Sequence, residues 1–454
     1  MSHREDFTRR DFLKTTSIAA AGLSVAAGSA ARVHAGENNT IKLAWIGCGN
    51  RGAGAIRQAL NADPNVKLIA AADAFEDKVE GMVGALADDE DFAGKVDCPP
   101  ERRFHGMDAY KKAIDCLDDG DVVLLTTPPA FRPLHFCYAV NSSKKINVFA
   151  EKPVASDIVN LRMLREANEK AKAKGIKVGV GLNNRNYLRT EETIEAIHDG
   201  KLGEVVSCFV YRFHGPHNLS PIGNWTPLQH QLRNIFCFDW TSGGFIVDAL
   251  IHNLDISCWA AGEYPAFAQG SGGRTHRTVK DQLIDIASVE YIFPSGKRLM
   301  MQTRTMPNTW SNFCAVIQGT NGVAHVGEGV PEPAIYKGFE GLTFSGIRSE
   351  PTWKASRPQN DSYQEEHNRL FAAIREDKEW NEMDRGIMAT FTALLGRMAT
   401  ETGEYLSAEQ VWKSEFRFDS EIAYGDLTYD GRSVVMPDEN GDYFIPQPGV
   451  TKFA

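Results

Sequence analysis

Three polar residues recur at helical spacing in the segment TSGGFIVDALIHNLDISCWAAG. Asp248, His252 and Asp255 are four and three positions apart, so on a helix they share one face. Apolar residues cover the other faces, which predicts a largely buried helix whose carboxylates and imidazole are paired or contact a ligand. One alternative is that His252 is a structural core residue whose hydrogen bonds are made within the protein. A metal site is another, but three ligands on one helix face do not close a coordination sphere, and we predict none.

A lysine in the tetrapeptide AEKP forms a second candidate centre. Lys152 lies between Glu151 and Pro153, directly after the apolar run INVFA. A lysine held at a dry crevice edge, near other positive charge, has a lowered pKa and can exchange protons with a sugar hydroxyl. We expect Glu151 to restrain the lysine or to cap the next helix. The alternative is a surface turn with an ordinary salt bridge.

The stretch 41–60 belongs to the framework that must position these residues. An apolar run enters a turn with Gly47, Gly49 and Gly52 in G-x-G-x-x-G spacing, and a helical pattern follows at once. The first glycine allows the tight turn, the second lets a pyrophosphate approach the backbone, and the third permits close helix packing. Asn50 and Arg51 lie within this turn, at the positive end of the helix, and we count them as cofactor contacts.

A second apolar run, residues 66–72, ends at Asp73, about twenty residues beyond the last glycine. A carboxylate there accepts hydrogen bonds from the adenosine ribose and repels a 2′-phosphate, so NAD is favoured over NADP as the cofactor. The alternative is an ordinary βαβ unit in which Asp73 caps a helix. Residues 74–104 are polar and acidic, and we expect a surface excursion there.

The buried run 122–125 predicts another parallel strand, which Thr126, Thr127 and Pro128 follow at its carboxyl end. In a doubly wound sheet this edge faces the ligand crevice. A helical segment with His135 comes next, and Arg185 follows a later strand that ends at Leu182. The sequence therefore predicts an α/β protein with an N-terminal Rossmann domain.

The N-terminus is predicted to carry a targeting signal. TRRDFLK precedes the mild apolar run SIAAAGLSVAAG, which predicts a twin-arginine export signal over residues 1–35 and a periplasmic location. A disordered basic N-terminus is the alternative. Because this route carries folded proteins, we expect the mature protein to hold its nucleotide tightly.

Composition excludes several classes of partner. The 454 residues are 43% hydrophobic and 24% charged, with a net charge of −10, so we predict no nucleic-acid binding and no stable membrane insertion. Eight scattered cysteines indicate neither a zinc framework nor a dense disulfide scaffold.

The chain resembles the Gfo/Idh/MocA family of sugar and inositol oxidoreductases in the order and spacing of four motifs. These are the glycine turn, the TPP…H segment, AEKP and GG-x-x-x-D-x-x-x-H-x-x-D. The resemblance implies a Rossmann domain over residues 36–182 and, over 183–454, an α/β domain with a large, mostly antiparallel sheet. That sheet is expected to support a homo-oligomer, a dimer or a tetramer. The cofactor contacts that it implies beyond the glycine turn are Thr127, Pro128, His135, Glu151 and Lys152.

The resemblance also implies roles in catalysis. Lys152 points at the reacting carbon and the nicotinamide, His252 is the general acid or base on the hydroxyl, and Asp248 orients substrate or histidine. Arg185 is expected to contact the substrate or the cofactor, whereas Asp255 is expected to be a structural partner. In the polar-aromatic excursion after residue 212, Trp225 is expected to stack on the carbohydrate, as are His214, His217, His230 and Trp240. Aromatic plugging of a long loop is the alternative.

We therefore predict a periplasmic NAD-dependent oxidoreductase that acts on a sugar, a cyclitol or a derivative. One alternative is an NAD-dependent glycoside hydrolase or lyase, in which transient oxidation acidifies a neighbouring C–H and elimination breaks the glycosidic bond. Another is a non-catalytic nucleotide or sugar sensor, because a fold alone does not establish activity.

Overall fold

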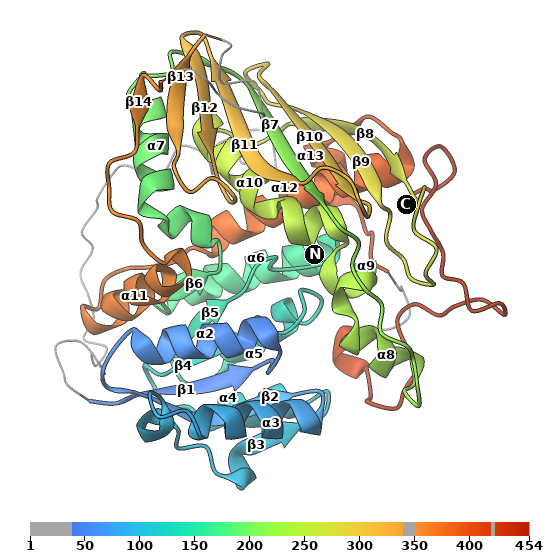
Figure 1. The fold of residues 1–454 in the computed structure, drawn as a ribbon. Coiled ribbons are helices and arrows are strands. Elements are labelled where there is room, and N and C mark those ends of the chain that lie inside the picture. Colours follow the sequence, from blue (N-terminus) through green and yellow to red (C-terminus); the bar gives the residue numbers. More distant parts are fainter. Residues whose placement is uncertain (1–38, 339–349, 419–422, 454) are drawn as a thin grey trace, which may run out of the picture.

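The computed structural model describes residues 39–338, 350–418 and 423–453, so the predicted export signal lies outside the described residues. Two sheets form the body of the protein, with a layer of helices between them (Figure 1). All eight cysteines are free. Within the described ranges, no helix combines the length and the apolar character that a membrane crossing requires.

The first sheet is six-stranded and entirely parallel, in the order β3-β2-β1-β4-β5-β6. Its strands are β1 (Ile41–Ile46), β2 (Val66–Asp73), β3 (Arg103–His105), β4 (Val122–Leu125), β5 (Asn147–Ala150) and β6 (Val178–Val180). The strand order reverses between β1 and β4, and ligands of such sheets bind outside the carboxyl ends of the strands at this switch point. The predicted Rossmann architecture is confirmed.

Helices cover both faces of this sheet. One face carries α2 (Asn50–Asn61) and α3 (Glu76–Ala87), and the other carries α4 (Ala109–Asp115), α5 (Arg132–Asn141) and α6 (Ile158–Ala173). The expectation of a surface excursion over residues 74–104 was wrong in part. Val79, Val83 and Leu86 are buried against the sheet at helical spacing, so α3 is an amphipathic helix whose charged residues occupy its outer side.

The second sheet has nine strands in the order β14-β13-β12-β11-β7-β10-β9-β8-β15. Its neighbours are antiparallel except for β7 and β10, which confirms the predicted, mostly antiparallel domain. The strands are β7 (Val205–His214), β8 (Phe267–Gly273), β9 (Ile286–Ile292), β10 (Arg298–Thr305), β11 (Asn312–Gly319), β12 (Gly322–Val326), β13 (Ala334–Lys337), β14 (Trp353–Lys354) and β15 (Leu406–Ser407).

Two long helices fill the space between the sheets. α10 (Phe245–Ala261) and α12 (Met383–Thr402) pack on each other and on the second sheet, and almost every residue of both is buried. The remaining helices of this half are α7 (Leu188–His198), α8 (Pro227–Arg233), α9 (Asp239–Ser242) and α13 (Ala408–Lys413). The helix α10 therefore carries Asp248, His252 and Asp255 into the middle of the molecule.

The helix α11 (Ser362–Arg375) returns the chain to the first domain. Leu370, Phe371 and Ile374 share a core cluster with strands β1 and β2 and with helices α2 and α3. Beyond α11, the carbonyl of Trp380 accepts a hydrogen bond from the N–H of Val178 on β6. The nucleotide-binding half is thus completed by residues from late in the chain.

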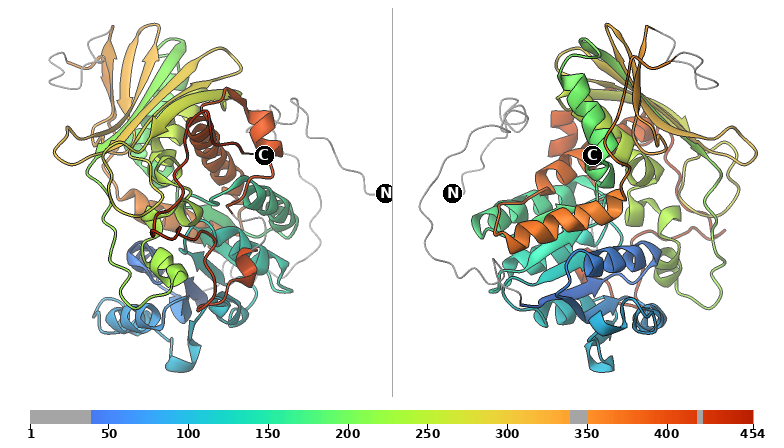
Figure 2. Two further views of the ribbon diagram at one scale, coloured as in Figure 1. Left: turned by 90° about the vertical axis from the view of Figure 1, so that its right-hand side faces the viewer. Right: turned by 60° about the vertical axis from the view of Figure 1, so that its left-hand side comes forward.

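The polar-aromatic excursion leaves the end of β7 and runs down beside the first domain, carrying α8 (Figures 1 and 2). A small apolar cluster joins it to Ala130 and Phe131 of the first domain and to Leu427 and Val434 of the C-terminal segment. Three stretches far apart in the sequence meet there.

Candidate active site

A cavity of about 570 Å³ lies at the carboxyl edge of β1, β2 and β4. The first domain contributes the glycine turn, the end of β2 and the segment after β4 to its wall, and the excursion contributes the opposite side. Most of the predicted cofactor contacts line it: Gly47, Gly49, Asn50, Arg51, Gly52, Asp73, Thr127, Pro128 and His135.

The three glycines of the turn have distinct surroundings. Gly47 has φ +98°, and a Cβ there would lie 2.6 Å from the backbone nitrogen of Thr127. A Cβ on Gly52 would lie 2.1 Å from the carbonyl oxygen of Gly47, whereas one on Gly49 would meet nothing within 4 Å. Gly47 and Gly52 are therefore required by close packing, and Gly49 leaves its space to the cavity. This cradle fits a pyrophosphate that approaches the backbone.

The N-terminus of α2 opens on the same cavity. Its N-cap is Gly49, which brings no side chain to the exposed N–H groups of the first turn. Such N–H groups and the helix dipole favour an anion. The donor set therefore fits the pyrophosphate of a dinucleotide.

Asp73 ends β2 and lies on the cavity wall. Its Oδ2 accepts the N–H of Cys48 at 2.7 Å, and its Oδ1 accepts the N–H of Phe75 at 3.0 Å. Burial raises the pKa of this carboxyl. Each oxygen keeps a second lone pair, so the residue can steady the glycine turn and also accept a ribose hydroxyl.

Thr127 and His135 contact each other at the cavity wall, with 3.1 Å between Oγ1 and Nδ1. The imidazole stacks on Tyr110, with ring centroids 4.1 Å apart. Burial lowers the pKa of His135 to about 3, so the ring is neutral near pH 7. His135 is thus a fixed, uncharged part of the wall.

Two predicted cofactor contacts, Lys152 and Glu151, do not line the cavity, and Glu151 contacts Arg51 instead. Its buried carboxylate accepts a hydrogen bond from Nε of Arg51, whose guanidinium also contacts Glu366 at 3.4 Å and covers the ring of Tyr363 at 4.6 Å. These contacts tie the glycine turn to β5 and to α11. Glu151 therefore restrains Arg51 in this structure.

Lys152 and Asp248, which the sequence places in separate motifs, lie together. The Nζ of Lys152 donates to the carbonyl oxygen of Asp248 at 2.9 Å and lies 3.6 Å from its Oδ1. Both side chains are about one-fifth exposed. Asp248 belongs to the first turn of α10, so this contact joins the edge of the Rossmann sheet to the central helix.

His252 lies one turn further along α10 and is buried. In the described part of the chain its Nδ1 has no hydrogen-bond partner, and its Nε2 lies 3.9 Å from Oε2 of Glu328. Burial, with the positive charges of Lys152 and Arg212, holds the pKa of His252 well below its usual range. The imidazole is therefore neutral near pH 7 and can accept a proton.

Glu328 is a candidate that sequence reasoning missed. It follows β12 between Gly327 and Gly329, which have φ of +103° and +84°. Its N–H donates to Oδ1 of Asn253, the neighbour of His252 on α10, at 3.1 Å. Burial raises the pKa of Glu328, so it can hold a proton at higher pH than a free glutamate. The G-E-G tripeptide after a strand was the available signal.

Arg212 is a second residue that sequence reasoning missed. It is half-buried near the end of β7, and its guanidinium lies 3.6 Å from the centroid of the Phe313 ring. Burial lowers the pKa of Arg212, and the nearby charges of Glu328 and Asp248 oppose that effect. Lys152, Asp248, His252, Glu328 and Arg212 thus form one group of charged and proton-carrying side chains.

Two predicted substrate contacts are not brought into this group. Arg185 forms a bidentate pair with Asp255, at 2.7 and 2.8 Å, and its guanidinium covers the ring of Trp259. The ring of Trp225 instead contacts Arg233 of the excursion, whose guanidinium lies 4.7 Å from the ring centroid. Within the described ranges, no group of three or more His, Cys, Asp or Glu side chains could hold a metal ion.

Comparison with protein families gives two adjoining matches. Residues 41–182 match the Gfo/Idh/MocA oxidoreductase family, NAD-binding Rossmann fold, and residues 194–384 match its C-terminal alpha/beta domain. Together the matches span well over half of the chain.

Curated relatives are more distant. A glycosyl hydrolase family 109 protein of Saccharopolyspora erythraea is 28% identical over 222 residues, 45% of each chain. Inositol 2-dehydrogenase of Rhizobium meliloti is 26% identical over 226 residues, 50% of this chain and 56% of that protein. The matched part spans about half the length of these relatives.

Among solved structures, the aldose-aldose oxidoreductase of Caulobacter crescentus in complex with glycerol has the same fold. The TM-score is 0.60 at 17% identity, over 81% of this chain and 100% of that one.

Proposed function

Because this chain belongs to the Gfo/Idh/MocA oxidoreductase family, whose first domain is an NAD-binding Rossmann fold, we propose that it is a dehydrogenase of sugars, cyclitols or their derivatives. One observation carries the proposal: Lys152 at the sheet edge contacts Asp248 on α10, one helical turn before neutral His252, whose pKa burial and the lysine's charge lower. An oxidoreductase that acts on a CH–OH group needs such proton-handling side chains.

The proposed cofactor contacts follow the cavity wall. The turn at Gly49 and the N-terminus of α2 would hold the pyrophosphate, and Asp73 would hold the adenosine ribose. Bound NAD supplies the hydride acceptor or donor, which no side chain can supply.

The chain's own residues then manage the substrate and its proton. His252 takes the proton of the substrate hydroxyl, and Lys152 donates a hydrogen bond to the same oxygen. Asp248 holds the lysine in place through its carbonyl and carboxylate. In the direction of reduction His252 returns the proton. Inositol 2-dehydrogenase and the aldose-aldose oxidoreductase, named for polyhydroxylated compounds, support a carbohydrate or cyclitol substrate.

We also propose export through the twin-arginine route to the periplasm and assembly as a homo-oligomer. The motif at Arg9 and Arg10 supports the export. An exported enzyme cannot exchange its nucleotide with the cytoplasmic pool. Either a second substrate recycles the bound nucleotide, or each turnover both oxidises and reduces the same sugar.

A redox-neutral glycoside hydrolase is a second candidate, which two observations favour. One relative is a glycosyl hydrolase family 109 protein. The second observation is that Glu328, another side chain that can carry a proton, lies 3.9 Å from His252. Cleavage by transient oxidation needs two acid–base groups, one for the hydroxyl and one for the neighbouring C–H or the leaving oxygen. His252 and Glu328 would fill these two roles.

The proposal is tested on protein purified from its exported form. The protein is denatured and the released nucleotide is identified by mass, and the intact protein is then given sugars and aryl glycosides while the absorbance of reduced nicotinamide is followed. We expect stoichiometric NAD and sugar-dependent reduction, which Lys152→Ala and His252→Ala lower by about 10²-fold or more. Lys170→Ala, at an exposed lysine on α6, is the matched control.

The outcomes separate the candidates. Glycoside cleavage without accumulated reduced cofactor would select the hydrolase. Unchanged turnover in Lys152→Ala and His252→Ala would contradict the roles assigned to these residues. A protein that neither holds nor takes up nucleotide would contradict both candidate functions.

A further inference from the structure

The excursion forms the outer wall of the nucleotide cavity. We call residues 217–237 the strap. The second domain provides this segment, although the cavity belongs to the first. The strap residues that line the cavity are His217, Asn218, Ser220, Leu232, Arg233, Asn234, Ile235, Phe236 and Cys237. They lie opposite Asp73, Phe75 and Lys78, at the end of β2 where a Rossmann domain binds adenosine.

Besides the apolar cluster with Ala130 and Phe131, one arginine attaches the far part of the strap to the first domain. The guanidinium of Arg233, at the end of α8, forms a bidentate pair with Asp77 on α3, at 2.6 and 3.1 Å. The same guanidinium lies 4.0 Å from the ring centroid of Phe75 and 4.7 Å from that of Trp225. Arg233 is thus stacked against aromatic rings from both domains.

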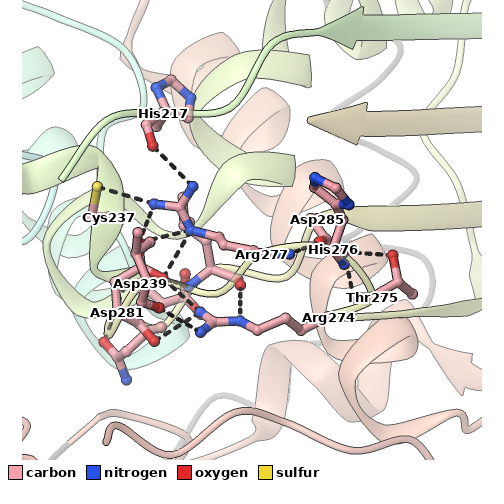
Figure 3. Close-up of polar contacts among 12 residues, drawn as sticks. His217, Cys237, Asp239, Arg274, Thr275, His276, Arg277, Asp281 and Asp285 are labelled. Atoms are coloured by element: carbon pink, nitrogen blue, oxygen red, sulfur yellow. Dashed lines mark hydrogen bonds and ion pairs between the residues drawn. The ribbon is translucent and has the colours of Figure 1, made fainter. Parts of the chain in front are cut away.

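The two ends of the strap are held together at its base (Figure 3). Arg277 donates to the carbonyl oxygen of His217 at 2.9 Å and to Sγ of Cys237 at 3.6 Å, and its Nε contacts both oxygens of Asp281. Arg274 contacts Asp281 from the other side, at 2.6 Å. One buried network therefore fixes the first and last residues of the strap.

The C-terminal segment supports the strap from behind. Gln229 donates to Asp430 at 3.0 Å, and Gln231 donates to the carbonyl oxygen of Val435 at 2.8 Å. Tyr429 meets the edge of Phe75, with centroids 5.7 Å apart. These contacts hold α8 to the C-terminal segment.

The attachments differ in exposure. The Asp281 side chain is fully buried, whereas the Asp77 side chain is 60% exposed. An exposed ion pair is weak compared with a buried hydrogen-bonded network, so the Arg233 end opens first.

We propose that Arg233 is a nucleotide-retaining residue: the strap closes over the adenosine half of a bound dinucleotide, and the Arg233–Asp77 pair must break before the nucleotide enters or leaves. The strap is closed in this structure, so opening limits uptake and release alike. A residue that only contacted the nucleotide would change release alone.

The test measures NADH binding kinetics on the full-length chain after any nucleotide that it retained has been removed. Uptake is followed by NADH fluorescence after rapid mixing, and release is followed on adding excess NAD. We expect Arg233→Ala to raise both rate constants about tenfold, because it removes the ion pair and the stacking. Asp77→Asn keeps the stacking and should raise both about threefold. Arg298→Ala, at a half-exposed ion pair on β10 of the second sheet, is the control and should change neither.

Three results would overturn the proposal. The first is unchanged uptake and release in both variants; Asp77 is a surface residue, so its variant remains informative if Arg233→Ala does not fold. The second is faster release with unchanged uptake, which would make Arg233 a direct nucleotide contact. The third is a parent chain that takes up no NADH.

Discussion

Glu328 faces His252 across 3.9 Å between Oε2 and Nε2, although the two residues come from different layers of the second domain. The helix that carries His252 also sets this distance, because Asn253 accepts the N–H of Glu328. The site therefore holds a carboxyl and an imidazole whose pKa values burial moves in opposite directions, upward for Glu328 and downward for His252.

Glu328→Gln separates the two candidate reactions. Glutamine keeps the shape but cannot exchange a proton, so glycoside cleavage should fall about 10²-fold if Glu328 is the second acid–base group. Simple sugar oxidation uses His252, not Glu328, as its acid–base group and should change by less than about threefold. Parallel assays with an aryl glycoside and its free sugar measure both rates. Glu332→Gln, at an exposed glutamate nearby in the chain, should change neither. Equal losses in both assays would contradict the division of roles.

Lys152→Met should shift the pH dependence of His252 upward. The positive charge of Lys152 disfavours the protonated imidazole, so its removal raises the pKa of His252. The base works in its neutral form, so the acidic limit of sugar oxidation lies below pH 6.5 in the parent and at higher pH in the variant. Titration of the histidine ring protons by NMR reads this without turnover, with Lys170→Met as the control. A downward shift or none would show that the two side chains are not coupled.

Alanine at Gly49 should weaken nucleotide binding, whereas alanine at Gly52 should destabilise the fold. The methyl group of Gly49→Ala has free space in the protein but occupies the place of the pyrophosphate, so the chain should fold normally and bind NADH about tenfold or more weakly. Gly52→Ala would place its methyl group 2.1 Å from a carbonyl oxygen, and such overpacking destabilises a fold by about 1–3 kcal/mol. Thermal melting and NADH fluorescence titration check both. A folded Gly49→Ala with unchanged affinity would contradict the fit.

His367 should make the protein sensitive to acid. It is fully buried on the ring of Phe149, neither ring nitrogen has a hydrogen-bond partner in the described structure, and burial lowers its pKa to about 3. Below pH 6.5 the unfolded chain takes up a proton that the folded chain excludes. The free energy of unfolding therefore falls by about 1.4 kcal/mol per pH unit from this residue, down to pH 3.

His367→Phe should flatten that dependence, as urea unfolding between pH 7 and pH 4 would show. The exposed His105→Phe is the control. Parallel slopes for the His367 variant and the parent would exclude this contribution.

The sequence located the residues whose signal is local. The glycine turn, Asp73, the EKP tripeptide and the spacing of Asp248 and His252 are each contained in one element and its flanking turn, so their positions follow from the period of that element. The parallel sheet then brings the glycine turn, Asp73 and the EKP tripeptide to one edge, and α10 carries Asp248 and His252.

Residues that depend on long-range pairing could not be found in this way. Glu328 follows β12 and Arg212 lies on β7, and the two meet at the site because β11 pairs with both strands. No local sequence pattern specifies this strand order. Arg185 was assigned to substrate, but its partner Asp255 is distant in sequence. Trp225 was assigned to substrate because it is aromatic and in a loop, and the contact with Arg233 depends on how α8 packs.

The position of α11 governs when the nucleotide site can exist at all. Leu370 and Phe371 fill the core under β1, and Glu366 contacts Arg51 of the glycine turn. On the ribosome, the first domain therefore lacks part of its interior until residue 375 has been synthesised and has left the exit tunnel. We therefore expect nucleotide loading to follow the synthesis of nearly all of the second sheet rather than to precede it.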